Sequence, residues 1–446
     1  MRDCLGTQRR RDFLRTGSLA LSSFGMADLL RSESQAAAGS LRGKSMIVLW
    51  LWGGPSHMET FDLKPSAPTE YRGEFQPIAT NVPGIEISEH LPLLARQADR
   101  FALIRSLHHD SPGHVNSTHT MLTGYEGDAI ENPPFLPKYP DMRAVIGRAK
   151  GPRSSQLPTH VAMPYTKYYG SAYLGNHLDP LLIADDPNAA NFSVPGFAVE
   201  ASLRPRFSDR VALLSQFDRY RRDIDASGAM TSMDRFQHEA ASILTGDAAR
   251  QAFDIHSEPA EVRDRYGRHD VGQRCLLARR LVEAGVRLVT IDFSTVKGQK
   301  AFSWDDHASV WNIFEQMKVR LPVLDQVVSA MIQDLYERQL QNDVLLVVMG
   351  EMSHTPRLSN FNGQPGREHW GQTMSVLLAG GGLRMGQAVG ATSIKGDEPT
   401  VRPFTPNDLQ ATFYHAMGVP LDLSFRNFAG RPTPILPGGV PIEELI

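Results

Sequence analysis

The stretch Val344–Trp370, VLLVVMGEMSHTPRLSNFNGQPGREHW, joins a strongly apolar run to a polar loop and indicates the class of fold. Its first part, residues 344–349, is apolar without alternation, which predicts a strand buried on both faces, as in a parallel sheet. Glu351 and His354 follow this strand, and His369 lies near the end of the stretch. Because open parallel sheets bind ligands at the carboxyl ends of their strands, these side chains form a candidate site. The alternative is a polar loop that only caps the sheet.

A second apolar run, residues 46–52, predicts another buried strand of the same sheet. It ends at the sequence GGP, residues 53–55, where glycines allow the backbone to approach a ligand closely. His57, Glu59 and Asp62 follow and form a second polar group.

A third polar group lies in residues 108–119, HHDSPGHVNSTH, after a helix predicted over residues 91–102. The group holds four of the fifteen histidines of the chain, including His114, and Ser117 lies three residues further along. Single histidines are usually structural, whereas this density is more typical of a metal site or a proton-transfer site.

A fourth polar group, residues 302–307, contains Asp305 and His307 and follows a strand predicted over residues 286–291. The groups that follow predicted strands should lie close together, since the carboxyl ends of parallel strands share one edge of the sheet.

The alternation of strands and helices predicts a doubly wound α/β fold, with a mostly parallel sheet and helices on both faces. An apolar stripe over residues 313–335, interrupted at Pro322, leads from the strand at 286–291 to the strand at 344–349. Such a βαβ unit is expected to have a right-handed crossover. Residues from about 150 to 260 are rich in turn formers and then charged, and we expect them to form an inserted lobe.

The first 38 residues have the organisation of an export signal. Three arginines, residues 9–11, precede Phe13-Leu14, an apolar run over residues 17–30 and the small residues 36–38. This order resembles a signal of the twin-arginine type, which exports folded proteins through the twin-arginine (Tat) machinery. We therefore expect a mature domain over residues 39–446, soluble in the periplasm or otherwise exported. The alternative is an ordinary basic, amphipathic start of the chain.

Charge and composition exclude several other classes of protein. The chain holds 46 Lys and Arg against 49 Asp and Glu, and without the signal 40 remain against 45, a net charge of −5. This weakly acidic balance offers no basic field for nucleic acid. After residue 38 the sequence contains no apolar run of the length that a membrane span requires. Cys275 alone remains after the signal, so no internal disulfide is expected.

The gathering of carboxylates and imidazoles in one place predicts a divalent metal. Carboxylates held together without a cation raise one another's pKa, and a metal ion removes that conflict. Mixed imidazole and carboxylate ligands favour zinc, manganese or iron over calcium, which prefers all-oxygen ligands. We expect one or two ions, zinc or manganese rather than calcium.

Several motifs together resemble the DUF1501 family of exported bacterial proteins, common in planctomycetes. They are GGPS at 53–56, WDDH at 304–307, GE at 350–351 with TP at 355–356, GREHW at 366–370, and the segment 265–283. The family in turn resembles the alkaline phosphatase and sulfatase superfamily, which implies an alkaline phosphatase-like fold with one or two metals.

The resemblance implies particular roles for the polar residues. The metal ligands would be Asp305, His307, Glu351 and His369, with Glu59 or Asp62 after the first strand, and His57 and His354 as further candidates. Superfamily members place the nucleophile ten residues before the glycine of a Leu-Thr-Gly helix end, and counting back from Gly124 gives His114. Ser117 would take this role if the register shifts by one helical turn. Arg367 would hold an oxyanion by paired hydrogen bonds.

These residues imply an exported, metal-dependent hydrolase of a phosphate or sulfate ester, with a small-molecule or saccharide ester as substrate. The alternative is a metal-containing binding protein of the same fold, without turnover, in an exported polysaccharide-processing assembly. His114 could be a nucleophile, a general acid or a metal ligand.

Overall fold

The computed structural model describes residues 43–111, 113–127, 137–166, 170–194 and 247–446. The expected export signal lies outside these residues, as does the charged stretch of the expected lobe over 195–246. Residues 44–446 form one compact unit. Among the helices in the described ranges, none is both long enough and apolar enough to cross a membrane.

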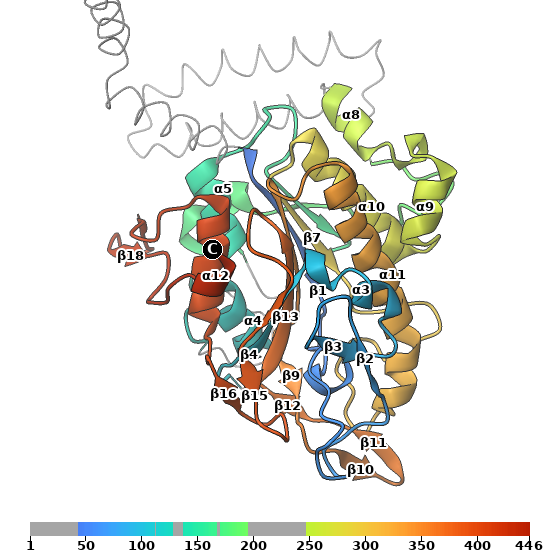
Figure 1. The fold of residues 1–446 in the computed structure, drawn as a ribbon. Coiled ribbons are helices and arrows are strands. Elements are labelled where there is room, and N and C mark those ends of the chain that lie inside the picture. Colours follow the sequence, from blue (N-terminus) through green and yellow to red (C-terminus); the bar gives the residue numbers. More distant parts are fainter. Residues whose placement is uncertain (1–42, 112, 128–136, 167–169, 195–246) are drawn as a thin grey trace, which may run out of the picture. The chain divides into compact units, whose positions relative to one another are not determined.

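The core of the fold is an eight-stranded sheet with the order β14-β4-β13-β8-β1-β7-β5-β6 (Figure 1). In that order the strands are Gln387–Val389, Ala102–Leu107, Met374–Gly380, Val344–Met349, Ser45–Trp50, Leu288–Asp292, His160–Met163 and Leu181–Leu182. Neighbouring strands pair in parallel, except that β13 runs antiparallel to both β8 and β4. The prediction of a mostly parallel sheet is therefore confirmed.

Helices cover both faces of this sheet (Figure 1). One face packs against α3 (Pro92–Ala95), α8 (Asp247–Phe253), α9 (Ala260–Tyr266), α10 (Asp270–Ala284) and α11 (Ile313–Glu337). The other face packs against α4 (His114–Thr123), α5 (Met142–Lys150) and α12 (Pro406–Met417). Strand β1 alternates between the two cores, with Ile47 and Leu49 in one and Met46 and Val48 in the other. The doubly wound arrangement is therefore confirmed.

Five short two-stranded ladders lie outside the central sheet in the described residues. They are β2 (Pro77–Ala79) with β3 (Glu86–Ser88), β9 (Ser353–His354) with β12 (His369–Trp370), β10 (Ser359–Phe361) with β11 (Gln364–Gly366), β15 (Ala391–Thr392) with β16 (Pro399–Val401), and β17 (Ser424–Arg426) with β18 (Pro432–Pro434). The β9–β12 pair sets His354 directly opposite His369.

Three elements differ from the sequence predictions. The helix predicted over residues 91–102 is reduced to α3 and a 3-10 turn at Ala98–Arg100, and its last residue, Ala102, begins strand β4, which pairs with β13. Helix α11 continues through Pro322 without a break. Strands β5 and β6 lie within the interval predicted as an insertion, and β5 pairs with β7, so this part belongs to the central sheet.

Candidate metal centre

The candidate site lies at the carboxyl edge of the sheet, beyond the ends of β4, β1, β7 and β8. His114 is the first residue of α4, which follows β4, and Asp305 follows β7. Glu351 is the second residue after β8, and His369 comes from the short strand β12. These four strands run in the same direction, and the segments that follow them therefore meet at one edge.

Four imidazoles surround the carboxylate of Asp305. Oδ2 lies 3.2 Å from Nε2 of His114. Oδ1 lies 2.7 Å from Nε2 of His307, 3.2 Å from Nε2 of His369 and 3.3 Å from Nε2 of His354. The rings of His114 and His369 meet edge to face with centroids 4.4 Å apart. All four side chains therefore turn Nε2 toward the carboxylate of Asp305.

The backbone around this point is held by close approaches that require glycine. Gly53 has φ +103°, and a Cβ there would lie 2.6 Å from the backbone nitrogen of Asp305. A Cβ on Gly366 would collide with the backbone of Ala308, next to His307. These contacts bring the loop after β7 against both the loop after β1 and strand β11.

Two glutamates contact the outer nitrogens of two of the histidines. His114 Nδ1 lies 2.8 Å from Oε1 of Glu351, which also accepts a 2.8 Å bond from the backbone N–H of Gly53. His307 Nδ1 is hydrogen-bonded to Oε2 of Glu368. Glu351 is fully buried, and within the described residues its Oε2 has no hydrogen-bond partner.

The electrostatics of the cluster are dominated by Asp305. Burial would raise the pKa of Asp305, but hydrogen bonds from the four histidines outweigh it and hold the pKa well below its usual range. Burial lowers the pKa of His114, yet its bonds to Asp305 and Glu351 raise it to about 10. The bond to Asp305 is the main cause that raises the pKa of His307 to about 9. Burial lowers the pKa of His354, which favours the neutral imidazole that can bind a metal.

The donor set fits a divalent metal ion. One donor atom each from His114, Asp305 and His369 lie within 4.8 Å of one another. Ligands of a tetrahedral zinc, bound at about 2.0–2.1 Å, lie about 3.3 Å apart. The Nε2 atoms of His114, His354 and His369 lie 3.2–3.3 Å from the Asp305 oxygens, close to that separation, whereas Nε2 of His307 lies at a hydrogen-bond distance of 2.7 Å. The buried Oε2 of Glu351 also has unused acceptor capacity at this site.

Arg367 and Glu59, expected as an oxyanion holder and a metal ligand, form a buried ion pair with each other. Arg367 Nη2 donates to Glu59 Oε1 at 2.7 Å, and Nε donates to Glu59 Oε2 at 3.0 Å. The guanidinium also donates to the carbonyls of Tyr71, Thr355 and Pro356. Both side chains are 0% exposed. Arg367 therefore ties loops together behind the cluster, with its donors directed to protein groups.

Three other candidate residues also bond to protein groups instead of joining the cluster. Asp62 accepts from Lys64 Nζ at 2.9 Å and Thr392 Oγ1 at 2.5 Å. The ring of buried His57 contacts Ser353 Oγ at 2.7 Å and the carbonyl of Gly396 at 2.8 Å. The side chain of Ser117, one turn after His114 on α4, donates to the carbonyl of Ser111 at 3.0 Å.

Glu368 was not singled out from the sequence, although it joins the site through His307. Its neighbours Arg367 and His369 are candidate site residues, and this position between them is the only feature of the sequence that points to Glu368. Sequence spacing could not show that Arg367 points into the core while Glu368 reaches His307.

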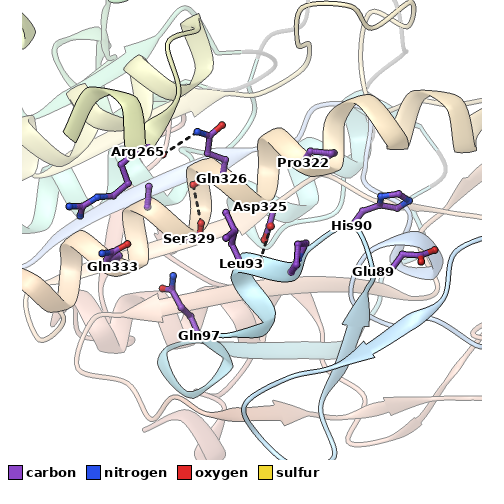
Figure 2. Close-up of a pocket in the computed structure, with 12 residues that line it drawn as sticks. Glu89, His90, Leu93, Gln97, Arg265, Pro322, Asp325, Gln326, Ser329 and Gln333 are labelled. Carbon is purple, nitrogen blue, oxygen red and sulfur yellow. Dashed lines mark hydrogen bonds between the residues drawn. The ribbon is translucent and has the colours of Figure 1, made fainter. Parts of the chain in front are cut away.

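A separate groove of about 590 Å³ lies between α3 and α11, and the residues of the cluster are not among those that line it (Figure 2). Its wall includes Asp325, whose two oxygens accept from the backbone N–H groups of Leu93 and Leu94 at 2.8 Å each. Asp325 therefore holds α3 against α11.

Comparison with solved structures finds similar chains of low identity. The lipoteichoic acid synthase LtaP from Listeria monocytogenes is 10% identical with a TM-score of 0.40, over 86% of this chain and 74% of that one. The PsFucS1 sulfatase from Pseudoalteromonas sp. is 11% identical with a TM-score of 0.36, over 88% and 72%. The phosphonate monoester hydrolase SpPMH from Silicibacter pomeroyi is 11% identical with a TM-score of 0.37, over 90% and 78%. Similarities of this size give the chain neither an activity nor a substrate.

Among curated proteins, none matches the chain. A family model described as "Protein of unknown function (DUF1501)" matches residues 43–446, which include the whole described sheet and all residues of the cluster. The chain therefore belongs to the DUF1501 family.

Proposed function

We propose that this protein is a metal-dependent hydrolase of a phosphate or sulfate ester, with the ion held between Asp305, His114 and His369 and with His307 and His354 as further candidate ligands. The observation that carries the proposal is the convergence of four Nε2 atoms on the Asp305 oxygens, at 2.7–3.3 Å. Its position at the carboxyl edge of a mostly parallel sheet, where such folds bind ligands, supports the same proposal. The ion would be zinc or manganese, one or two in number.

A bound divalent ion would polarise the ester oxygens and offset the charge that develops on them. The protein would supply the shape and charge of the site. Asp305 brings the negative charge that a cation requires, and the buried His354 brings a neutral imidazole. Both ring nitrogens of His114 are hydrogen-bonded to carboxylates, Nδ1 to Glu351 and Nε2 to Asp305. We therefore assign His114 as a metal ligand or a general acid, with water as the nucleophile of the hydrolysis.

The second candidate is a metal-containing binding protein without turnover. The superfamily resemblance places the nucleophile at His114. Both ring nitrogens of His114 are hydrogen-bonded to carboxylates, so this side chain has no free nitrogen for attack, which favours a protein without turnover. The side chain of Ser117, the other nucleophile candidate, is bonded to the carbonyl of Ser111. A binding protein would keep the metal and hold an ester or saccharide without cleaving it.

Activity of the metal-loaded, full-length protein separates the two candidates. The purified protein is stripped with a chelator, reloaded with Zn²⁺ or Mn²⁺, and assayed on aryl phosphates, aryl sulfates and phosphonate monoesters. We expect turnover only with metal, and its loss by at least about 100-fold in Asp305→Asn and His369→Ala. His415→Ala, an exposed histidine on α12, is the matched control and should behave as the wild type. Tight metal binding without turnover on any of these esters would favour the binding protein.

We further propose that the protein is exported in folded form, with residues 1–38 as its twin-arginine signal. The support is the order of Arg10-Arg11, Phe13-Leu14 and the apolar run that follows. Replacing Arg10 and Arg11 with Lys should leave the precursor in the cytoplasm, as cell fractionation would show. Normal export of that variant would contradict the proposal.

A further inference from the structure

We propose that Glu368 is a positioning residue of the metal centre: it holds the ring of His307 so that Nε2 faces Asp305. This inference rests on the metal site proposed above. It goes beyond that site by assigning a role to a residue that does not contact the reacting atoms.

The ring of His307 packs edge to face against His369, with centroids 4.7 Å apart, but only the partners of its two nitrogens determine which atom of the ring faces Asp305. Its side chain is 22% exposed, and its two ring nitrogens face two different carboxylates. Nε2 lies 2.7 Å from Asp305 Oδ1, and Nδ1 is hydrogen-bonded to Glu368 Oε2. A ring that lost the second bond could rotate and turn a carbon toward Asp305. Glu368 therefore selects the nitrogen that the metal centre receives.

Glu368 is itself held in place, although its side chain is 48% exposed. Its Oε1 accepts a 2.9 Å bond from the hydroxyl of Ser359, on strand β10. Its backbone N–H donates to Oγ1 of Thr355 at 3.0 Å, and its carbonyl accepts from the N–H of Thr355 at 2.7 Å. An exposed glutamate with no such anchors would spread over several rotamers. The bond from Ser359 fixes the carboxylate and the two bonds with Thr355 fix the backbone of residue 368, which supports a positioning role toward His307.

The opposite side of the cluster repeats the arrangement. Glu351 Oε1 lies 2.8 Å from Nδ1 of His114, whose Nε2 also faces Asp305. Glu351 is 0% exposed, so replacing it would disturb the fold together with the site. Glu368 performs the same task at the surface, where it can be replaced with little cost to packing.

A carboxylate on the outer nitrogen of a metal-binding histidine fixes the tautomer and raises the basicity of the ring. Loss of such a partner typically weakens metal affinity by about 10–100-fold. We therefore expect an effect of this size on the affinity of the site for Zn²⁺, with the global fold retained.

The first measurement is the Kd for Zn²⁺ of the full-length protein, by competition with a chromogenic chelator. Glu368→Ala should weaken binding by about 10–100-fold, and Glu368→Gln, which keeps an acceptor oxygen, by less. Ser359→Ala should give a smaller loss in the same direction. Glu337→Ala is the matched control, because the Glu337 side chain is 49% exposed and pairs with Arg265 on α9. A Glu368→Ala protein that binds Zn²⁺ as tightly as the wild type would overturn the proposal.

The second measurement is the imidazole N–H spectrum of the metal-free protein by ¹⁵N NMR. The Nδ1–H signal of His307 should be protected from solvent exchange in the wild type and in Glu337→Ala, and lost in Glu368→Ala. If the wild type bound neither Zn²⁺ nor Mn²⁺ but showed this pattern, the proposed function would fail, while the role of Glu368 in positioning His307 would stand. An Nδ1–H signal that is absent from the wild type, or unchanged in Glu368→Ala, would overturn the positioning role itself.

Discussion

The buried pair of Glu59 and Arg367 gives the sharpest test of whether Arg367 supports the fold or binds substrate. Replacing Glu59 with Gln keeps the volume and removes the charge that compensates the guanidinium. Arg367 would keep its bonds to the carbonyls of Tyr71, Thr355 and Pro356, but its positive charge would stay buried without a carboxylate. Breaking a buried pair from one side typically costs about 3–5 kcal/mol. This is a large part of the roughly 5–15 kcal/mol by which folded proteins are usually stable.

The assay is urea unfolding of the metal-free protein, followed by tryptophan fluorescence. We expect Glu59→Gln to lower the free energy of unfolding by about 3–5 kcal/mol. The double variant Glu59→Gln with Arg367→Met should lose less than the sum of the two single changes, because the partners interact directly. Glu74→Gln, at an exposed pair with Lys318, is the control and should change stability by less than about 1 kcal/mol. An Arg367→Met protein as stable as the wild type, but unable to bind an ester, would refute the structural role and restore Arg367 as a substrate residue.

Three further predictions concern the cluster and its surroundings. His114→Ala should weaken Zn²⁺ binding by about 10-fold or more and leave the fold intact, whereas lost turnover at full metal content would mark His114 as a nucleophile or acid. Burial lowers the pKa of His57 to about 4 from 6.5, so the unfolded chain takes up a proton first as the pH falls. The stability contributed by neutral His57 is therefore complete above pH 6.5 and decreases by about 3 kcal/mol in total toward pH 4; equal pH slopes for His57→Gln and the wild type in urea unfolding would contradict this. Gly366→Ala should lower both Zn²⁺ affinity and stability, since its Cβ would collide with Ala308, whereas Gly438→Ala, which meets no atom within 4 Å, should lower neither.

The parts of the fold that could be predicted are those with long, continuous apolar runs. Strands β1 and β8 are such runs, and burial on both faces is what a parallel sheet requires. Strand direction is not encoded in such a run: β13 is buried along its whole length, like β8, yet it is antiparallel. Strand β4 begins at Ala102, where the predicted helix was expected to end, and was not predicted as a strand. Its pairing with β13, a long-range contact, decides its conformation.

The site could be anticipated where topology alone brings residues together. Asp305 and His307 follow β7 and Glu351 follows β8, strands that end at one edge, and the structure gathers them there with His114 and with His369 of β12. The partners of Arg367 could not be anticipated, because the direction of its side chain is set by contacts with Glu59, 308 positions away in the chain.

The most direct test of the metal centre is anomalous X-ray diffraction from crystals of the protein grown with Zn²⁺, recorded on both sides of the zinc absorption edge. The proposal predicts an anomalous peak within bonding distance of Asp305, His114 and His369, about 2.0–2.2 Å from each donor atom. Ordered side chains at these positions with no anomalous peak between them, at a Zn²⁺ concentration that saturates the protein in solution, would contradict it.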